Sequence, residues 1–353
     1  MSSSRRQTSP SRTVEVRILI ISDTHSTPLR HASVKEDGNR QAFAAPLPPC
    51  DVLIHCGDLT NVGALHEYDL ALDMLGSIDA ELKLVVAGNH DVSLDEAFCA
   101  GVPKSAPSRS THEDSYTAVA SQAARTMWLG KRARDVAVTY LEEGMHQFKL
   151  RSGAKFTVYA SPYTPFFCDW AFPYAAHEDR FNPSSASLSD ADNIAHNPIP
   201  DRSDNVIDIM VTHGPPFDRL DRTDTDDSVG CPHLLRATMR ARPRLHCFGH
   251  IHEGWGAERV RWAADADEVL RVAQSTQEWK MGGYGRGIKS AERLPVNREK
   301  MLKERAAFVD ISKQSGVGLE AGRETLMVNA AIMDVQYSPA NAAWLVSLEL
   351  PVS

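Results

Sequence analysis

The sequence predicts an α/β layered fold, because short apolar strands alternate with an amphipathic helix in the first third of the chain. We expect strands over residues 14–22, 51–57 and 83–87. Between the last two, Tyr68, Leu72 and Leu75 recur at helical spacing within 64–75, and Gly76 is suited to end that helix. Of the 353 residues, 42% are hydrophobic, which is enough apolar material for a sizeable core.

The remaining elements follow from the same patterns along the chain. We expect strands over 155–160, 206–212 and 245–248, and helices over 232–242 and 297–308. The segments 326–331 and 344–350 are expected to form a closing hairpin. Residues 1–12 are rich in Ser and Arg and predict a disordered tail. The length of residues 13–353 allows one large domain or two, with inserted loops expected near 103–125, 180–204 and 280–322.

Charge and cysteine content exclude some classes of protein. The formal charge of -8 argues against general nucleic-acid binding or attachment to a membrane surface. None of the six cysteines forms a C-x-x-C pair, which predicts free thiols in a reducing compartment. No signal peptide and no run long enough to span a bilayer is visible, so we expect a cytoplasmic protein.

Five polar clusters each follow an apolar run that is predicted to be a strand. They share side chains of only three kinds: carboxylates, imidazoles and amides. In chain order they are Asp23-Thr24-His25, Gly57-Asp58, Gly88-Asn89-His90-Asp91, Thr212-His213-Gly214 and Gly249-His250-Ile251-His252. Sites in α/β proteins gather at the carboxyl ends of strands. The set therefore predicts a centre for two divalent cations, which need six to eight such ligands in all.

Spacing within the clusters supports specific roles. Residues two apart in extended backbone face the same way, so Asp23 and His25 can reach one cation. Asp58 has two carboxylate oxygens and can bridge two cations. His90 is free to act as a general acid or as an electrostatic partner of the transition state, and Asp91 is expected to orient its imidazole. Asn89 supplies a neutral oxygen ligand.

In this order, the motifs D-x-H, G-D, G-N-H-[DE], H and G-H-x-H resemble those of the calcineurin-like metallophosphoesterase superfamily. Thr212-His213-Gly214-Pro215-Pro216 and the segment 248–256 resemble more closely the MPPED-type (metallophosphoesterase domain-containing) proteins and their fungal relatives. The resemblance covers roughly residues 16–262. It implies a four-layer fold, in which a two-sheet β-sandwich is flanked by helices, and a single metallophosphoesterase domain.

The resemblance also implies a role for each matching residue. Asp23, His25 and His252 would hold the first metal; Asn89, His213 and His250 would hold the second; and Asp58 would bridge them. A hydroxide bridging the metals would attack phosphorus, and His90 would assist the leaving oxygen. Mixed imidazole, carboxylate and amide ligands suit Mn²⁺, Fe or Zn²⁺ better than an all-oxygen Mg²⁺ or Ca²⁺ site does. Of these we favour Mn²⁺, with Fe, Zn²⁺ or Mg²⁺ as alternatives.

One departure from the superfamily bears on the substrate. Its protein phosphatases carry an arginine in the motif G-D-x-x-D-R-G, and Val62 stands at that position here. We therefore expect a small-molecule phosphate ester, and favour a phosphodiester such as a cyclic nucleotide. The alternatives are a phosphomonoesterase or nucleotidase, and a nucleotide- or metal-binding regulatory protein with low turnover.

Two further groups of side chains are expected to have mainly structural roles. A run of aromatic residues is expected chiefly to pack, although it could also wall a cleft; its members are Tyr163, Phe166, Phe167, Trp170, Phe172 and Tyr174. Four arginines lie near the end of the helix expected at 232–242, namely Arg236, Arg240, Arg242 and Arg244. The carboxyl end of a helix favours cations, so these arginines need no phosphate-binding role.

Overall fold

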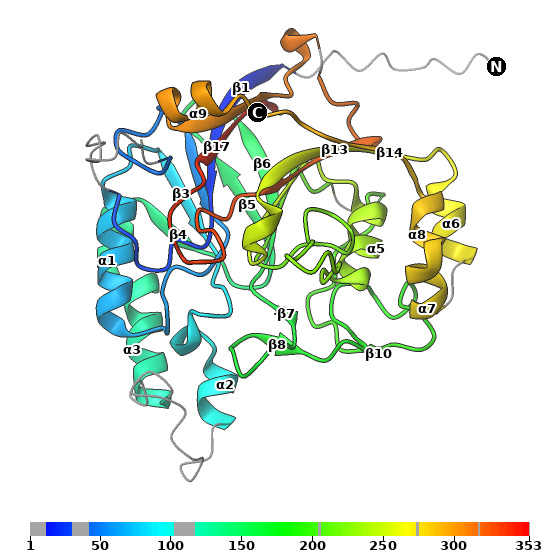
Figure 1. Ribbon diagram of the computed structural model, residues 1–353, viewed down its shortest axis with the longest axis horizontal. Helices are drawn as coiled ribbons and strands as arrows, with labels where there is room; N and C mark the ends of the chain where they lie inside the picture. Colours follow the sequence, from blue (N-terminus) through cyan, green and yellow to red (C-terminus); the bar gives the residue numbers. More distant parts are fainter. Residues whose placement is uncertain are drawn as a thin grey trace, which may run out of the picture.

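The computed structural model describes residues 12–29, 42–101, 117–203, 206–272, 275–316 and 318–352. Most of its strands form two sheets that face each other, with helices on both outer sides (Figure 1). The expected four-layer α/β sandwich is thereby confirmed. Residues 1–11 and 102–116, which include most of the expected tail and part of one expected insertion, lie outside the described residues.

The first sheet has six strands in the order β15-β17-β1-β2-β3-β4. Their bounds are β1 Thr13–Ile21, β2 Val52–His55, β3 Leu82–Val85, β4 Val138–Tyr140, β15 Ala306–Asp310 and β17 Ala343–Pro351. β1 to β4 run parallel, and β17 pairs antiparallel with β1. Side chains alternate along β1: Ile18 and Ile20 face the core between the sheets, while Leu19 and Ile21 face the outer helices.

The second sheet has seven strands in the order β14-β13-β16-β12-β11-β6-β5. Their bounds are β5 Gly144–Lys149, β6 Lys155–Ser161, β11 Ile209–Thr212, β12 Leu245–Phe248, β13 Gly256–Trp262, β14 Ile288–Arg293 and β16 Glu324–Asn329. β6, β11, β12 and β16 are parallel. Two short strand pairs stand apart, formed by β7 Thr164–Pro165 with β8 Pro173–Tyr174 and by β9 Glu178–Asp179 with β10 Asp192–Asn193.

Helices cover the outer faces of both sheets (Figure 1). On the first sheet lie α1 Leu65–Gly76 and α3 Ala118–Leu129, and α2 Glu96–Gly101 and α4 Lys131–Asp135 are their neighbours. On the other side lie α5 Pro232–Ala241, α6 Ala266–Val272, α7 Thr276–Glu278 and α8 Tyr284–Arg286, while α9 Arg298–Glu304 precedes β15. α5 is held by buried contacts of Leu235 and Met239 with Phe248. No helix in the described part of the chain is long and apolar enough to cross a bilayer.

Three expectations about the C-terminal third were wrong. The segments expected to form a hairpin became β16 and β17, which belong to different sheets. The helix expected over 297–308 ends at Glu304, and residues 306–310 form β15 beside β17. The region 280–322 is not simply a loop, because β14 and β15 close one edge of each sheet. In each case pairing with a strand distant in sequence overrode the local pattern.

Candidate metal centre

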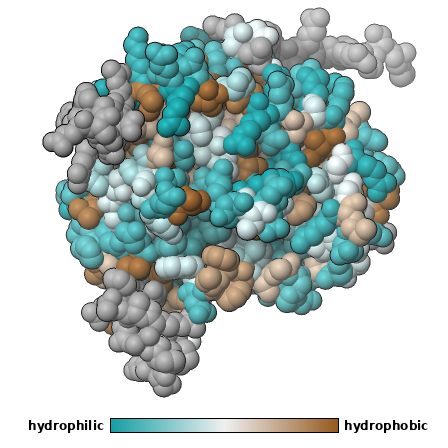
Figure 2. Space-filling view, viewed as in Figure 1, coloured by the Kyte–Doolittle hydropathy of each residue, from teal (hydrophilic) through white to brown (hydrophobic). Residues whose placement is uncertain are grey.

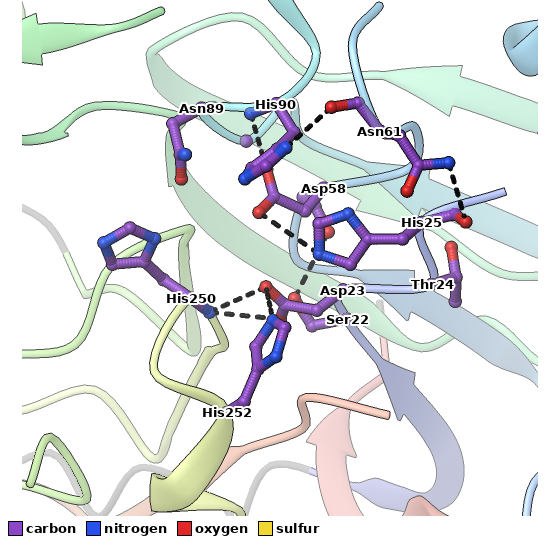
Figure 3. Close-up of polar contacts among 12 residues, drawn as sticks. Ser22, Asp23, Thr24, His25, Asp58, Asn61, Asn89, His90, His250 and His252 are labelled. Atoms are coloured by element: carbon purple, nitrogen blue, oxygen red, sulfur yellow. Dashed lines mark hydrogen bonds and ion pairs between the residues drawn. The ribbon is translucent and has the colours of Figure 1, made fainter. Parts of the chain in front are cut away.

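The polar clusters meet where parallel strands of both sheets end (Figure 3). Asp23 follows β1, and Asp58 follows β2, in the first sheet. His213 follows β11, and His250 follows β12, in the second sheet. Because the sheets face each other, two sets of strand ends form one polar site.

The potential ligands fall into two groups. In the first, Asp23, His25 and His252 each offer a ligand atom, and these atoms lie within 4.8 Å of one another. In the second, Asp58, His213 and His250 do the same, within the same limit. Asn89 joins the second group, since its Oδ1 lies 2.8 Å from Nε2 of His213. The structure thus brings together all seven residues that were expected to be ligands.

Asp58 lies between the two groups (Figure 3). Its Oδ1 is 3.3 Å from Nε2 of His213, and its Oδ2 is 3.7 Å from Nε2 of His25. Each oxygen of this carboxylate therefore faces a different group, as a ligand shared by two cations requires.

Backbone carbonyls orient three of the histidines. Nδ1 of His25 donates to the carbonyl of Thr60 at 3.0 Å, and His213 and His252 make the equivalent bond to Cys56 and Asp334. A protonated Nδ1 leaves Nε2 with a lone pair for a cation. Nε2 of His25 is buried and has no hydrogen-bond partner. A buried imidazole nitrogen without a partner is costly, and a bound cation would remove that cost.

The strand ends hold several of these residues in left-handed backbone conformations. The φ angles are 53° at Asp23, 42° at His25, 54° at Asp58 and 67° at His250. Such conformations cost non-glycine residues of order 1–3 kcal/mol each and concentrate at functional sites. Gly57 has a φ of 104°, and a Cβ there would lie 2.7 Å from the carbonyl oxygen of Ala87. Its neighbour Asp58 is therefore placed by a turn that only glycine fits.

Burial and pairing set the charge of the ligands. Burial raises the pKa of Asp23, but the hydrogen bond and charge of His252 outweigh burial and lower that pKa to about 2. Burial lowers the pKa of His252, but Asp23 outweighs it and raises the pKa to about 9, so a cation that binds at Nε2 would displace a proton from this imidazole. Burial lowers the pKa of His250 to about 3, which keeps its imidazole neutral, as a metal ligand must be.

His90 lies at the edge of the site and is only partly buried. Its backbone N–H donates to Oδ1 of Asp58 at 2.8 Å, and its Nδ1 donates to the carbonyl of Asn61 at 2.7 Å. The imidazole also stacks on Trp170, with ring centroids 3.8 Å apart. These contacts leave Nε2 of His90 available to a bound molecule.

Asp91 does not have the expected place beside the imidazole of His90. Its carboxylate accepts hydrogen bonds from the backbone amides of Leu59, Thr60 and Gly88, and from the hydroxyl of Thr60. The carbonyl of Asn61 contacts Nδ1 of His90 instead. Asp91 thus shapes the loop that carries Asp58. The expectation failed because a backbone turn separates these neighbouring side chains.

Aromatic residues lie beside the site, and one of them, Tyr337, had no sequence signal. Tyr337 lies in the connection between β16 and β17, with its ring centroid 4.8 Å from that of His25 and 5.3 Å from that of His252. Phe166 and Phe167 are 61% and 66% exposed, and Figure 2 shows hydrophobic surface over β7 and β8. The expectation that the aromatics chiefly pack holds for the buried Phe172 and Tyr174.

The fold and the paired ligand groups define a class of protein. The family model described as calcineurin-like phosphoesterase matches residues 16–254. The chain belongs to this family, as the resemblance of its motifs implied.

Individual relatives are similar over most of this chain. Metallophosphoesterase domain-containing protein 1 of Homo sapiens is 33% identical over 68% of this chain and 61% of its own length. UPF0046 protein T07D4.2 of Caenorhabditis elegans is 28% identical over 60% of this chain and 48% of its own. A protein named probable rhamnogalacturonate lyase C of Emericella nidulans is 31% identical over 70% of this chain, but the match covers 18% of that protein. The chain thus spans less than two thirds of these relatives.

Proposed function

We propose that this protein is a dinuclear metal-dependent hydrolase of phosphodiesters such as cyclic nucleotides. The observation that carries the proposal is the position of Asp58, whose two oxygens face His213 and His25 in separate ligand groups. Membership of the calcineurin-like phosphoesterase family supports the reaction class.

The residues fit two divalent cations, with Mn²⁺ favoured. Asp23, His25 and His252 would hold one cation, and Asn89, His213 and His250 the other, with Asp58 shared. When bound, the two cations would supply charge neutralisation for the phosphate and activation of a water nucleophile. The chain itself holds the ligands at fixed separation, because three of the imidazoles are tied to backbone carbonyls.

His90 would donate a proton to the leaving oxygen. The bond from its Nδ1 to the carbonyl of Asn61 fixes the ring, and Trp170 covers one face. Nε2 would then point to the bound ester. A positioned acid of this kind contributes roughly 10²–10⁴-fold to a rate.

The residue at position 62 supports a diester over a phosphoprotein substrate. The Val62 side chain cannot pair with a phosphate, and its backbone amide donates to Glu67 at 3.2 Å. A diester carries one negative charge and a monoester about two near neutral pH, so a diester depends less on an added cation.

The free cysteines support the expected reducing, cytoplasmic compartment.

The test is hydrolysis of bis-p-nitrophenyl phosphate by purified protein with Mn²⁺, before and after chelation, beside p-nitrophenyl phosphate. We expect metal-dependent turnover that favours the diester. Asp58→Asn should lower the metal content and abolish turnover, while the exposed control Asp69→Asn should change neither. Two bound metals without turnover on either ester would overturn the enzymatic proposal and favour a regulatory binding protein. Preference for the monoester would favour a phosphomonoesterase.

A further inference from the structure

A second cavity, of about 870 Å³, lies between α5, α6 and the segment 185–203. Its lining includes the five arginines Arg202, Arg236, Arg240, Arg242 and Arg271. Two acidic residues, Asp201 and Asp267, also line it. Three of these arginines, Arg236, Arg240 and Arg242, belong to the run near the end of α5. From the sequence, the preference of a helix carboxyl end for cations was enough to explain that run. The structure adds arginines from two other segments to the same wall.

The cavity is positive in a chain that is negative as a whole. Five arginines against two aspartates leave a formal surplus of three positive charges in the lining, and Glu268, which pairs with Arg271 at 3.0 Å, reduces the surplus to two. The whole chain has a formal charge of -8. Concentrating cations in one place costs free energy unless an anion balances them. An anion with more than one negative charge would balance this surplus.

Contacts within the protein do not satisfy Arg240 fully. Arg240 pairs with Asp201 at 2.6 Å and donates to the carbonyl of Ile199 at 2.6 Å. Its side chain is only 9% exposed, yet its Nε is buried without a hydrogen-bond partner. Burial lowers the pKa of Arg236 to about 10; the charge of Asp179 opposes this lowering, and the nearby charge of Arg240 adds to it. Two buried guanidinium groups that repel each other would be stabilised by a further negative charge.

The cavity is separate from the metal centre. Arg242 follows the end of α5 and comes before β12 begins at Leu245, whereas His250 comes after β12 ends at Phe248. The strand therefore separates the two positions, and no candidate metal ligand lines the cavity.

We propose that this cavity binds a small anion carrying two or more phosphate groups. The planar guanidinium group donates paired hydrogen bonds that match phosphate oxygens. Arg202 and Arg271 stand on the exposed side of the cavity, while Arg236 and Arg240 form its buried wall. A diphosphate has two phosphate groups, one for each set of arginines, whereas a single phosphate has one. The volume is in the range of small-molecule sites.

The test uses inorganic diphosphate as the probe and the full-length, metal-loaded chain. Arg202→Gln/Arg271→Gln removes two exposed arginines, and Arg271 is 72% exposed. Arg132→Gln/Arg151→Gln is the matched control, because both arginines are exposed, form surface ion pairs and lie outside the cavity. Calorimetric titration should give two binding events in the wild type and the control, one at the metal centre and one at the cavity.

We expect the arginine double variant to lose at least tenfold in affinity for the cavity event alone. Asp58→Asn should lose the metal-centre event and keep the other, which separates this proposal from the hydrolase proposal. The cavity event should also weaken with added salt. The proposal would be overturned if the wild type showed a single binding event and Asp58→Asn removed it. It would also be overturned if the second event had the same affinity in the arginine double variant as in the wild type. A parallel titration with ADP compares a nucleotide with the free diphosphate. Whichever of the two binds more tightly, the proposal stands if that binding depends on the same arginines.

Discussion

His90 stacks on Trp170, with ring centroids 3.8 Å apart and ring planes inclined by 29°. The same imidazole lies beside the metal centre, since its centroid is 4.8 Å from that of the candidate ligand His25, with the two ring planes nearly perpendicular. Trp170 therefore restricts the one imidazole that is assigned to the leaving group.

Trp170→Ala should lower kcat by roughly three- to tenfold, because an aromatic pair of this kind contributes about 0.5–1.5 kcal/mol. Metal content should not change, since Trp170 stacks on His90, which is not a candidate ligand. Phe167→Ala is the control, because Phe167 is a neighbouring aromatic that is 66% exposed. Equal losses in both variants would show that the effect is not specific to His90.

His90→Ala should slow turnover by roughly 10²–10⁴-fold while both metals stay bound, because a general acid is lost but no ligand is. Metal analysis beside steady-state kinetics checks this. Loss of a metal in this variant would show that His90 is a ligand. The effect should be smaller on a diester whose leaving group is a weak base, since such a group needs less protonation.

Asp91→Asn should destabilise the protein by about 2–4 kcal/mol. The carboxylate accepts several buried hydrogen bonds, whereas the NH₂ group of an asparagine would face backbone N–H groups that are donors themselves. Asp91 accepts from the amides of Leu59, Thr60 and Gly88. Denaturant unfolding of the metal-free protein measures the change. Unaltered stability together with lost turnover would restore the idea that Asp91 acts on His90.

Tyr337→Gly should raise KM more than it lowers kcat, because the ring is 51% exposed beside His25 and His252 and is placed to contact substrate. Glycine suits the φ of 57° at this position, so the backbone should tolerate the change. Tyr337→Phe should keep the wild-type KM. If both variants behave like the wild type, Tyr337 does not contact the substrate.

Glu324 should make stability depend on pH. Burial raises its pKa, but hydrogen bonds from Arg259 and Arg261 outweigh burial and lower the pKa below the ordinary 4.5. A lowered pKa stabilises the fold above that ordinary value, and the contribution is lost as pH falls through the lowered pKa.

Glu324→Gln should therefore cost about 1–3 kcal/mol near neutral pH, since hydrogen bonds to a charged group are lost. The gap in unfolding free energy between wild type and variant should shrink in acid. A gap that is constant with pH would contradict the assigned charge. Glu142→Gln is a control, because the Glu142 side chain is 58% exposed and pairs with Arg125, outside the Glu324 cluster.

Much of the fold could be predicted, because the strands of the inner layers are short, apolar and bounded by turn residues. β1, β2, β3, β6 and β12 all lie close to their expected ranges. Prediction failed for β14 and β15, which pair at the sheet edges. β14 is almost entirely exposed, so its signal of burial is weak, and β15 begins with Ala306 and Ala307, which suit a helix as well as a strand. Only the neighbouring strand makes each of them a strand.

The sequence by itself determined which chemical groups are present and the order in which strand ends present them. Asp23, Asp58 and His250 could be recognised because carboxylates and imidazoles that follow successive apolar runs are typical of metal sites. Only the tertiary structure decided that Asp58 faces both ligand groups, that Asn61 rather than Asp91 contacts Nδ1 of His90, and that Tyr337 lies beside His25. These relationships join residues far apart in the chain or separated by a turn, and the packing of two sheets fixes them, so no local pattern encodes them.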